Sequence, residues 1–219
     1  METWISNAVV LVVLLSLWIL ASSRLLTVLR SVALQGAVLA VIPLLLAAEE
    51  GAHGVALGHA LVLAAASLIL KAGLMPWLLW RAIRTTSIRH DVEPLVGFGP
   101  SLLLGAILTG LSFVAANQLS LPVEAGARIL PAGGLATLLL GLLVLVGRTK
   151  AVVQVVGYLM VENGIFLFGL LLSHRMPTLV EAGILLDVFA GVFIMGIFVY
   201  RIQQTFDHMD THNLATLKD

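Results

Sequence analysis

Three side chains that can carry a charge lie inside long apolar stretches of the 219-residue chain: Lys71, Glu162 and Asp187. A charge at bilayer depth costs about 2.5–3.5 kcal/mol on insertion scales, so residues of this kind usually serve a function. One lysine and two carboxyl groups, linked by water, can pass protons from one to the next. The pattern therefore predicts a proton or ion relay. The alternative is that each is a structural group, hydrogen-bonded to a neighbouring helix.

Three further polar residues are secondary candidates. His59 is a possible proton carrier, although a capping or interfacial role would also explain it. Asn163 adds a neutral hydrogen-bonding group beside Glu162. Glu181 opens the last apolar run, where its interaction with the helix dipole is a sufficient structural reason for it.

Several other kinds of chemistry find no support in the sequence. The chain has no cysteine, so it cannot bind an iron–sulfur cluster through thiolates. Its six histidines lack metal-ligand spacing, and we find no nucleophile with a base and no phosphate loop. Twelve basic and twelve acidic residues cancel, which removes any argument from charge for nucleic-acid binding. We expect this chain to bind no cofactor and no metal.

The composition predicts that the candidate residues are surrounded by a membrane. Hydrophobic residues make up 60% of the chain and charged residues only 11%, whereas a soluble domain carries about 25% charged residues. A spanning helix needs roughly 20 mostly apolar residues, and continuous runs favour helices over barrel strands. We expect an all-α integral membrane protein with seven transmembrane helices, of which the second is short and the third long. The windows are 4–23, 31–48, 55–80, 98–117, 129–147, 151–172 and 179–200.

The distribution of basic residues predicts how these helices are oriented. Cytoplasmic loops of bacterial-type membrane proteins are enriched in lysine and arginine. With the N-terminus outside and the C-terminus inside, nine basic residues fall on the inner side and two on the outer side. The inner group is Arg24, Arg30, Arg81, Arg84, Arg89, Arg148, Lys150, Arg201 and Lys218, and the outer group is Arg128 and Arg175.

The same topology places the three ionisable groups at one depth. Lys71, Glu162 and Asp187 lie ten, twelve and fourteen residues from the nearest basic residue of the inner side, which is about 15–21 Å along a helix. This is near the midplane of a core about 30 Å thick. Pro76 removes the backbone hydrogen bond to Ala72, which should loosen the helix one turn past the lysine and admit water. Close helix contacts around the carboxyl groups are expected at Gly157, Gly164, Gly183 and Gly191.

The residues around Glu162 carry a family resemblance. The pattern Gly-Tyr-x-x-x-Glu-Asn-Gly occupies 157–164, and the segments 175–183 and 213–218 extend the likeness. Over 148–219 the chain closely resembles the hydrogenase-4 component E family of membrane proteins. The first 120 residues match mainly in hydropathy and in Lys71 with Pro76. That family belongs to the membrane arms of formate hydrogenlyase-type and other energy-converting group 4 NiFe-hydrogenase complexes.

The last three predicted helices also resemble two smaller proteins. These are the K-type subunit of respiratory complex I and the C-type subunit of Mrp-type multisubunit Na⁺/H⁺ antiporters, which carry one buried glutamate in each of their last two helices. Asp187 takes the place of the second glutamate, and Glu162 stands three residues after the first, about one helical turn away. The resemblance implies a membrane region at 1–120, a K-like region at 128–203 and a cytoplasmic tail at 204–219.

These resemblances imply a noncatalytic subunit that carries part of a proton or Na⁺ path, with Glu162, Asp187 and Lys71 as the relay. The NiFe centre and iron–sulfur clusters would lie in partner subunits. The implied partners are antiporter-like and quinone-site-like membrane subunits, a peripheral hydrogenase module and the lipid of a prokaryotic inner membrane. The alternatives are a scaffold that joins the hydrogenase module to antiporter-like subunits, a subunit of a complex I or Mrp-type assembly, and a free-standing transporter.

Overall fold

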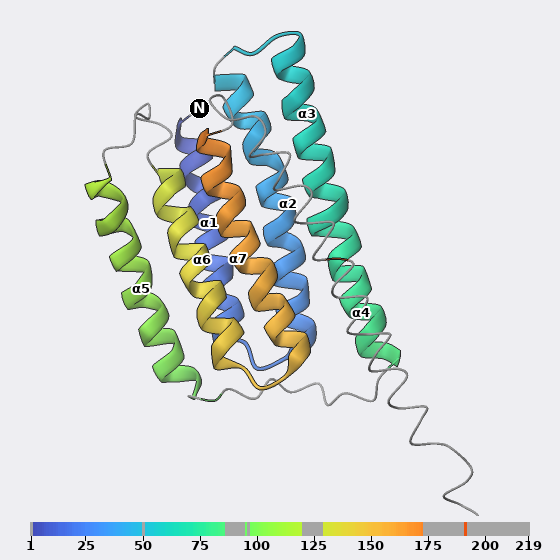
Figure 1. The fold of residues 1–219 in the computed structure, drawn as a ribbon, viewed down its shortest axis with the longest axis vertical. Coiled ribbons are helices and arrows are strands. Elements are labelled where there is room, and N and C mark those ends of the chain that lie inside the picture. Colours follow the sequence, from blue (N-terminus) through green and yellow to red (C-terminus); the bar gives the residue numbers. More distant parts are fainter. Residues whose placement is uncertain are drawn as a thin grey trace, which may run out of the picture.

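The computed structural model describes residues 2–49, 51–85, 95, 97–119, 129–172 and 191, and the regular elements in them are helices (Figure 1). In chain order these are α1 (Glu2–Ala21), α2 (Leu25–Glu49), α3 (Val55–Ser67), the π-helix η1 (Leu68–Leu74), α4 (Met75–Thr85), α5 (Phe98–Gln118), α6 (Ile129–Gly147) and α7 (Ala151–Leu172).

Six helical stretches in this part of the chain are long and apolar enough to cross a membrane, and α3, η1 and α4 together form one of them. They coincide with six of the seven predicted windows, so the chain is a multi-pass, all-helical membrane protein. The seventh window, 179–200, lies outside the described residues except for Gly191. Asp187, Glu181 and the predicted tail at 204–219 also lie outside them.

The second helix corrects one expectation. The sequence predicted a short span at 31–48, but α2 has 25 residues and begins at Leu25. Its first turns bury Leu25 and Val28 in the core, while Arg30 lies exposed on the other face. Because an exposed arginine near a helix end can extend its charged head toward the boundary, it does not interrupt the helix. The third span is long, as predicted, and covers 27 residues, Val55–Arg81.

Four helices form the centre of the bundle. Figure 1 shows α1 and α7 between α6 and α2, with α5 on the α6 flank and the continuous α3–η1–α4 helix on the α2 flank. α1 contacts α2, α5 and α6, while α7 contacts α6 and α2. Helices from the predicted regions 1–120 and 128–203 therefore pack together in one bundle. The boundary between these regions stays a prediction.

The tightest contact joins α6 to α7, and two pairs of glycines make it possible. A Cβ on Gly157 would lie 2.5 Å from the backbone nitrogen of Leu145 and 2.9 Å from the carbonyl oxygen of Gly141. One on Gly164 would lie 2.7 Å from the carbonyl oxygen of Gly134. Small residues let helix backbones approach in this way when hydrocarbon cannot drive association. The close contacts predicted at Gly157 and Gly164 are confirmed, and they fix α7 against its neighbour.

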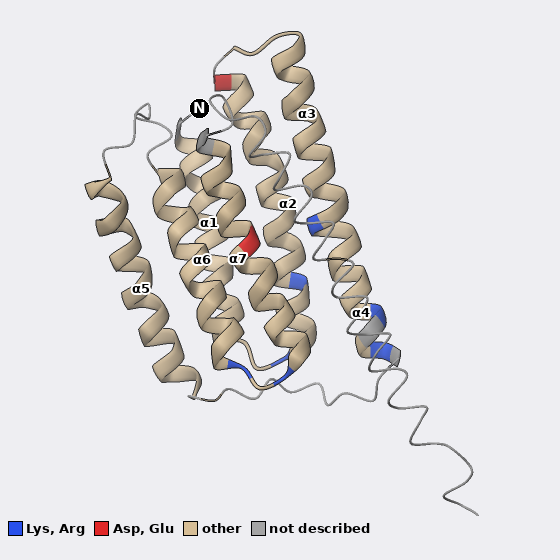
Figure 2. Ribbon diagram, viewed as in Figure 1, with Lys and Arg blue, Asp and Glu red and all other residues tan. Residues whose placement is uncertain are grey.

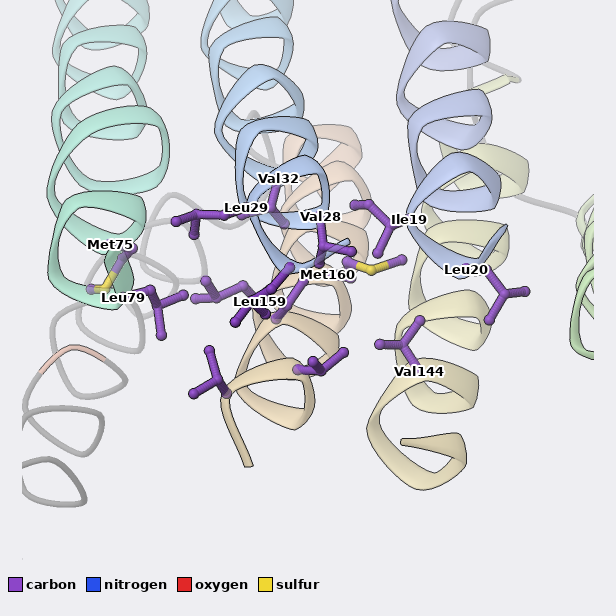
Figure 3. Close-up of a cluster of buried hydrophobic side chains, with 14 of the residues drawn as sticks. Ile19, Leu20, Val28, Leu29, Val32, Met75, Leu79, Val144, Leu159 and Met160 are labelled. Carbon is purple, nitrogen blue, oxygen red and sulfur yellow. The ribbon is translucent and has the colours of Figure 1, made fainter. Parts of the chain in front are cut away.

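Two apolar clusters hold the bundle together at different levels. Figure 3 shows part of the first, where side chains of α1, α2, α4, α6 and α7 converge, including Leu20, Val28, Leu79, Val144 and Met160. The second joins α1, α2, α6 and α7 through Ile5, Val9, Val12, Leu39, Ile42, Leu130, Leu167 and Leu170. Along α2 the clusters are separated by a stretch containing Gln35, and along α7 by a stretch containing Glu162 and Asn163. The polar groups thus lie midway along the bundle.

We predict that Gly141→Ala lowers the free energy of unfolding by about 1–3 kcal/mol, because its Cβ would stand 2.5 Å from the backbone nitrogen of Val161. The matched control is Gly147→Ala in the same helix, where a Cβ meets nothing within 4 Å. Unfolding of the purified protein in detergent, followed by tryptophan fluorescence, measures the difference. Equal stabilities of the two variants would contradict the tight contact.

Candidate functional site

Glu162 lies near the middle of α7, and its side chain is only 5% exposed. The sequence of α7 contains no proline, and the glycines at 157 and 164 let this helix pack closely against α6. A carboxyl group is thereby held inside the protein at a depth where hydrocarbon surrounds the bundle.

Lys71 lies in the π-helix η1 and is 7% exposed. The N–H of Met75 donates to the carbonyl of Leu70, the bond of a five-residue turn, and the next residue, Pro76, has no N–H to donate. The predicted disturbance is present, but the wide turn includes the lysine itself and precedes the proline. π-turns of this kind occur frequently at functional sites.

A glycine in α2 brings this wide turn close to the centre of the bundle. A Cβ on Gly36 would lie 2.7 Å from the carbonyl carbon of Lys71, so only a glycine fits here without displacement. The close approach lets Lys71 reach past α2 to α7, where its Nζ stands 5.3 Å from the ring centroid of Phe166. A cation over an aromatic face at this distance is attracted by the ring. Because Phe166 is four residues after Glu162, both lie on one face of α7.

A chain of buried hydrogen bonds crosses the same level. Gln35 of α2 is fully buried and donates from Nε2 to Ser16 Oγ, at 2.8 Å, and to the carbonyl of Val12, at 3.2 Å. Its Oε1 accepts from Nδ2 of Asn163, at 3.1 Å. Ser16 in turn donates to the carbonyl of Val12. The hydrogen-bonding role predicted for Asn163 is confirmed, and the network links α7 to α2 and α1.

Gln35 and Ser16 were not predicted from the sequence. The signal available was the presence of an amide side chain in the middle of the 25-residue apolar helix α2. A buried amide in a membrane helix needs a partner on another helix. The identity of that partner could not be read, because Gln35 and Asn163 are 128 residues apart in the chain.

His59 is not part of this buried group. It is exposed on α3, twelve residues before Lys71, which is about 18 Å along the helix. Asp187 and Glu181 lie outside the described residues. Gly191, which is described, contacts α4: a Cβ on it would lie 2.6 Å from Cε of Met75. The structure therefore brings Lys71 to α7, the helix that carries Glu162 and Asn163, but leaves His59 apart.

The two ends of the bundle differ in charge. Figure 2 shows lysine and arginine at one end, around the α1–α2 and α6–α7 connections and along α4, while an acidic position marks the opposite end of α2. On α4 the guanidinium of Arg84 stands 3.9 Å from the ring centroid of Trp80, and that of Arg81 stands 5.8 Å from Trp77. Both tryptophans are exposed, and tryptophan is enriched where membrane helices meet the interface. The orientation relative to the membrane stays a prediction.

Arg148 closes the basic end of the bundle. The sequence predicts a loop residue here, and Arg148 does lie in the connection between α6 and α7, but its side chain is only 2% exposed. Its Nη2 donates to the carbonyl of Leu20 at the end of α1, its guanidinium lies over the ring of Phe98, and its own carbonyl accepts from Gln154. Burial lowers the pKa of the Arg148 guanidinium, although an arginine remains charged at any physiological pH. This residue ties the ends of α1, α5, α6 and α7 together.

Taken together, the described residues place two titratable side chains on contacting elements inside the bundle. Lys71 supplies an amine and Glu162 a carboxyl group, and the ring of Phe166 lies under the amine one turn after Glu162 on α7. Asn163 and Gln35 add neutral donors and acceptors. Among the described residues, no group of three or more histidine, aspartate or glutamate side chains could hold a metal ion.

Comparisons with known proteins give two kinds of relative. An uncharacterized protein of Mycobacterium tuberculosis is 36% identical over 211 residues, which cover 94% of this chain and 92% of that protein. Hydrogenase-4 component E of Escherichia coli (strain K12) and that of Shigella flexneri are each 33% identical over 160 residues, which cover 72% of this chain and 73% of the relative. No family model matches the chain. No solved structure matches it.

We predict that Arg148→Met destabilises the protein by about 1–3 kcal/mol, because the buried carbonyl of Leu20 loses its donor while the volume of the side chain is nearly kept. Arg84→Met, on the exposed face of α4, is the matched control and should cost less than about 1 kcal/mol. Thermal unfolding in detergent measures both. A smaller effect at position 148 than at position 84 would show that Arg148 does not tie the helix ends.

Proposed function

This chain belongs to the hydrogenase-4 component E family, and we propose that it is a noncatalytic membrane subunit of an energy-converting hydrogenase complex of the hydrogenase-4 or formate hydrogenlyase type. Its task is to contribute buried ionisable residues to proton translocation, or Na⁺ translocation, that is coupled to electron transfer in partner subunits. The observation that carries this proposal is the contact between the helices of Lys71 and Glu162, made through Phe166 in the middle of the bundle.

The cost of burial supports a functional role for these two residues. Each charge at this depth destabilises a spanning helix by about 2.5–3.5 kcal/mol or more, whereas leucine in the same place would stabilise it. Lys71 also requires a wide turn and the close approach of Gly36. A structural role does not require a titratable side chain, so the cost of burying these two favours a function in proton or ion transfer.

Asp187 is the proposed third member of the relay, and its case rests on the sequence. Asp187 comes four positions before Gly191, just as Lys71 comes four positions before Met75. Gly191 contacts Met75. In the proposed topology of seven spans the third and seventh run in the same direction, so a helix through 187 and 191 would place the carboxyl group at the depth of the lysine.

In the proposed relay a proton moves sideways between the buried groups. The ammonium of Lys71 gives a proton through water to a carboxylate, Glu162 or Asp187, which leaves a neutral amine and a neutral carboxylic acid. The acid then releases its proton to one side of the path while the amine takes one from the opposite side, so the ammonium and the carboxylate are restored and one proton has moved. Na⁺ would use the two carboxylates as oxygen ligands in the same place.

The electron-transfer chemistry is proposed to lie in partner subunits. This chain has no cysteine, and iron–sulfur clusters and NiFe centres depend on thiolate ligands, so the residues present do not fit these groups. The proposed neighbours are antiporter-like and quinone-site-like membrane subunits and a peripheral hydrogenase module. The proposed location is the prokaryotic inner membrane, with the N-terminus outside and the basic end, seen in Figure 2, at the cytoplasm.

A scaffold is the second candidate function. Its support is that the contacts of Lys71 with Phe166 and with the backbone of Gly36 are also what a structural lysine would make. In that case the subunit joins the hydrogenase module to antiporter-like subunits and moves no ion. A place in a complex I or Mrp-type assembly rests on the proposed likeness of the last three helices to the K-type and C-type subunits.

We predict that Glu162→Gln and Asp187→Asn leave the complex assembled and able to transfer electrons, but lower the number of protons moved per hydrogen turned over by about 100-fold or more. The measurement is proton or Na⁺ uptake by membrane vesicles against hydrogenase activity in the same sample. Glu49→Gln, at the exposed end of α2, is the control and should change neither. Normal coupling in both of the first two variants would favour the scaffold.

Lys71→Gln should produce the same loss of coupling, because glutamine can hydrogen-bond but cannot donate and recover a proton at this position. Lys150→Gln, just before the first residue of α7 and outside the apolar region, is the control. Ion uptake in vesicles again gives the readout, with assembly of the complex checked by its intact mass. Full coupling in Lys71→Gln would remove the lysine from the relay while leaving the carboxyl groups in it.

A further inference from the structure

Two consecutive residues of α2, Gln35 and Gly36, each contact a different helix that carries an ionisable group. Figure 1 shows α2 between α7 and the α3–η1–α4 helix, and the contacts of α2 with α7 and with η1 agree with this view. Gln35 binds Asn163, the residue after Glu162. Gly36 lies against the backbone of Lys71.

The bond from Asn163 to Gln35 fixes how α7 is rotated. Nδ2 of Asn163 donates to Oε1 of Gln35, so that the Nε2 of Gln35 must face the other way, toward Ser16 and the carbonyl of Val12. All the polar side chains in this network are buried, with exposed fractions of 0% for Gln35 and Ser16 and 3% for Asn163. One residue along a helix corresponds to a turn of about 100°, so a slip of α7 that moved Glu162 to another face would break this contact.

The apolar clusters do not supply that directionality. Both clusters already join α2 to α7 through leucine, valine and methionine side chains, and apolar contacts tolerate small rotations because they are not directional. A buried amide pair is tolerant of neither rotation nor slip, since an unsatisfied amide in such surroundings costs free energy. The amides therefore specify an arrangement that the clusters alone leave open.

Gly36 fixes the position of η1, the helix that carries Lys71. Its missing side chain lets the carbonyl of Lys71 lie where a Cβ would be only 2.8 Å away. A larger residue would push η1 outward and draw Nζ of Lys71 away from Phe166. Two adjacent residues of α2 thus set the distance between Lys71 and α7: Gly36 holds the backbone of Lys71, and Gln35 holds Asn163 of α7.

We propose that Gln35 is a positioning residue of the relay. With Gly36 beside it, Gln35 sets the rotation of α7 and the separation between Lys71 and Glu162, without itself carrying a proton. This inference rests on the proposed function, because it assigns to α2 the geometry that the proposed proton exchange requires.

The test uses the assembled complex in membrane vesicles and compares five variants. Gln35→Met keeps the volume of the side chain and removes the amide, and it should lower ion uptake per hydrogen turned over by roughly fivefold or more while hydrogenase activity continues. Gly36→Ala should do the same through displacement of η1. Ser31→Ala, which removes a buried hydroxyl bonded only within α2, is the control and should leave coupling unchanged.

The rescue variant is the double exchange Gln35→Asn with Asn163→Gln, which keeps the total length of the amide pair and should restore coupling. A role in packing alone predicts no such recovery, because the exchange changes the shapes on both helices. If Gln35→Met fails to assemble, recovery of assembly and coupling in the double exchange supports the proposal. Failure of the double exchange to recover either one overturns it.

The Glu162→Gln variant distinguishes the positioning role of Gln35 from the relay itself. Lost coupling in Glu162→Gln with normal coupling in Gln35→Met would overturn the positioning role and leave the relay in place. Normal coupling in both would overturn the relay itself. As a second readout, the infrared band of the Glu162 carboxyl group, identified by its loss in Glu162→Gln, should shift in Gln35→Met and return in the double exchange.

Discussion

Polar groups inside a membrane protein have to find their partners in the protein, because hydrocarbon offers none. Gln35 illustrates the consequence of this constraint. Its amide satisfies groups on α1 and α7 at once, and its neighbour Gly36 admits the backbone of Lys71. Apolar residues hold the bundle together above and below this level. The hydrogen bonds among Ser16, Gln35 and Asn163 determine which faces of α1, α2 and α7 meet.

Much of the fold could be predicted from the sequence, since a spanning helix requires a long run of apolar residues that a hydropathy profile detects. Six apolar windows appear as helices, and the burial of Lys71 and Glu162 follows from their places within those windows. The start of α2 was predicted six residues too late, because a charged residue interrupts the hydropathy signal. Arg30 was interpreted as the end of the apolar run, whereas a helix can carry an arginine on one exposed face and continue.

The contacts between helices could not be predicted in the same way. Hydropathy says nothing about which faces meet, so neither the place of Phe166 under Lys71 nor the bond between Gln35 and Asn163 was foreseen. Arg148 is a similar case. It lies in a loop, as predicted, but its carbonyl partner and aromatic neighbour come from α1 and α5, and only the assembled bundle shows that it is buried.

The wide turn at η1 has a consequence for how such chains can vary. A π-turn accommodates one residue more than an α-turn of the same height, so the segments before and after it keep their own faces toward the bundle although their helical phases differ. Loss of one residue within Leu68–Leu74 would let the wide turn close to an α-turn of the same height, and α4 would keep its face toward the bundle. Loss of one residue from the regular helix of α3 would instead turn α4 by about 100°. The wide turn is therefore the place in this span where the chain can lose a residue without turning the tryptophans and arginines of α4 toward a different neighbour.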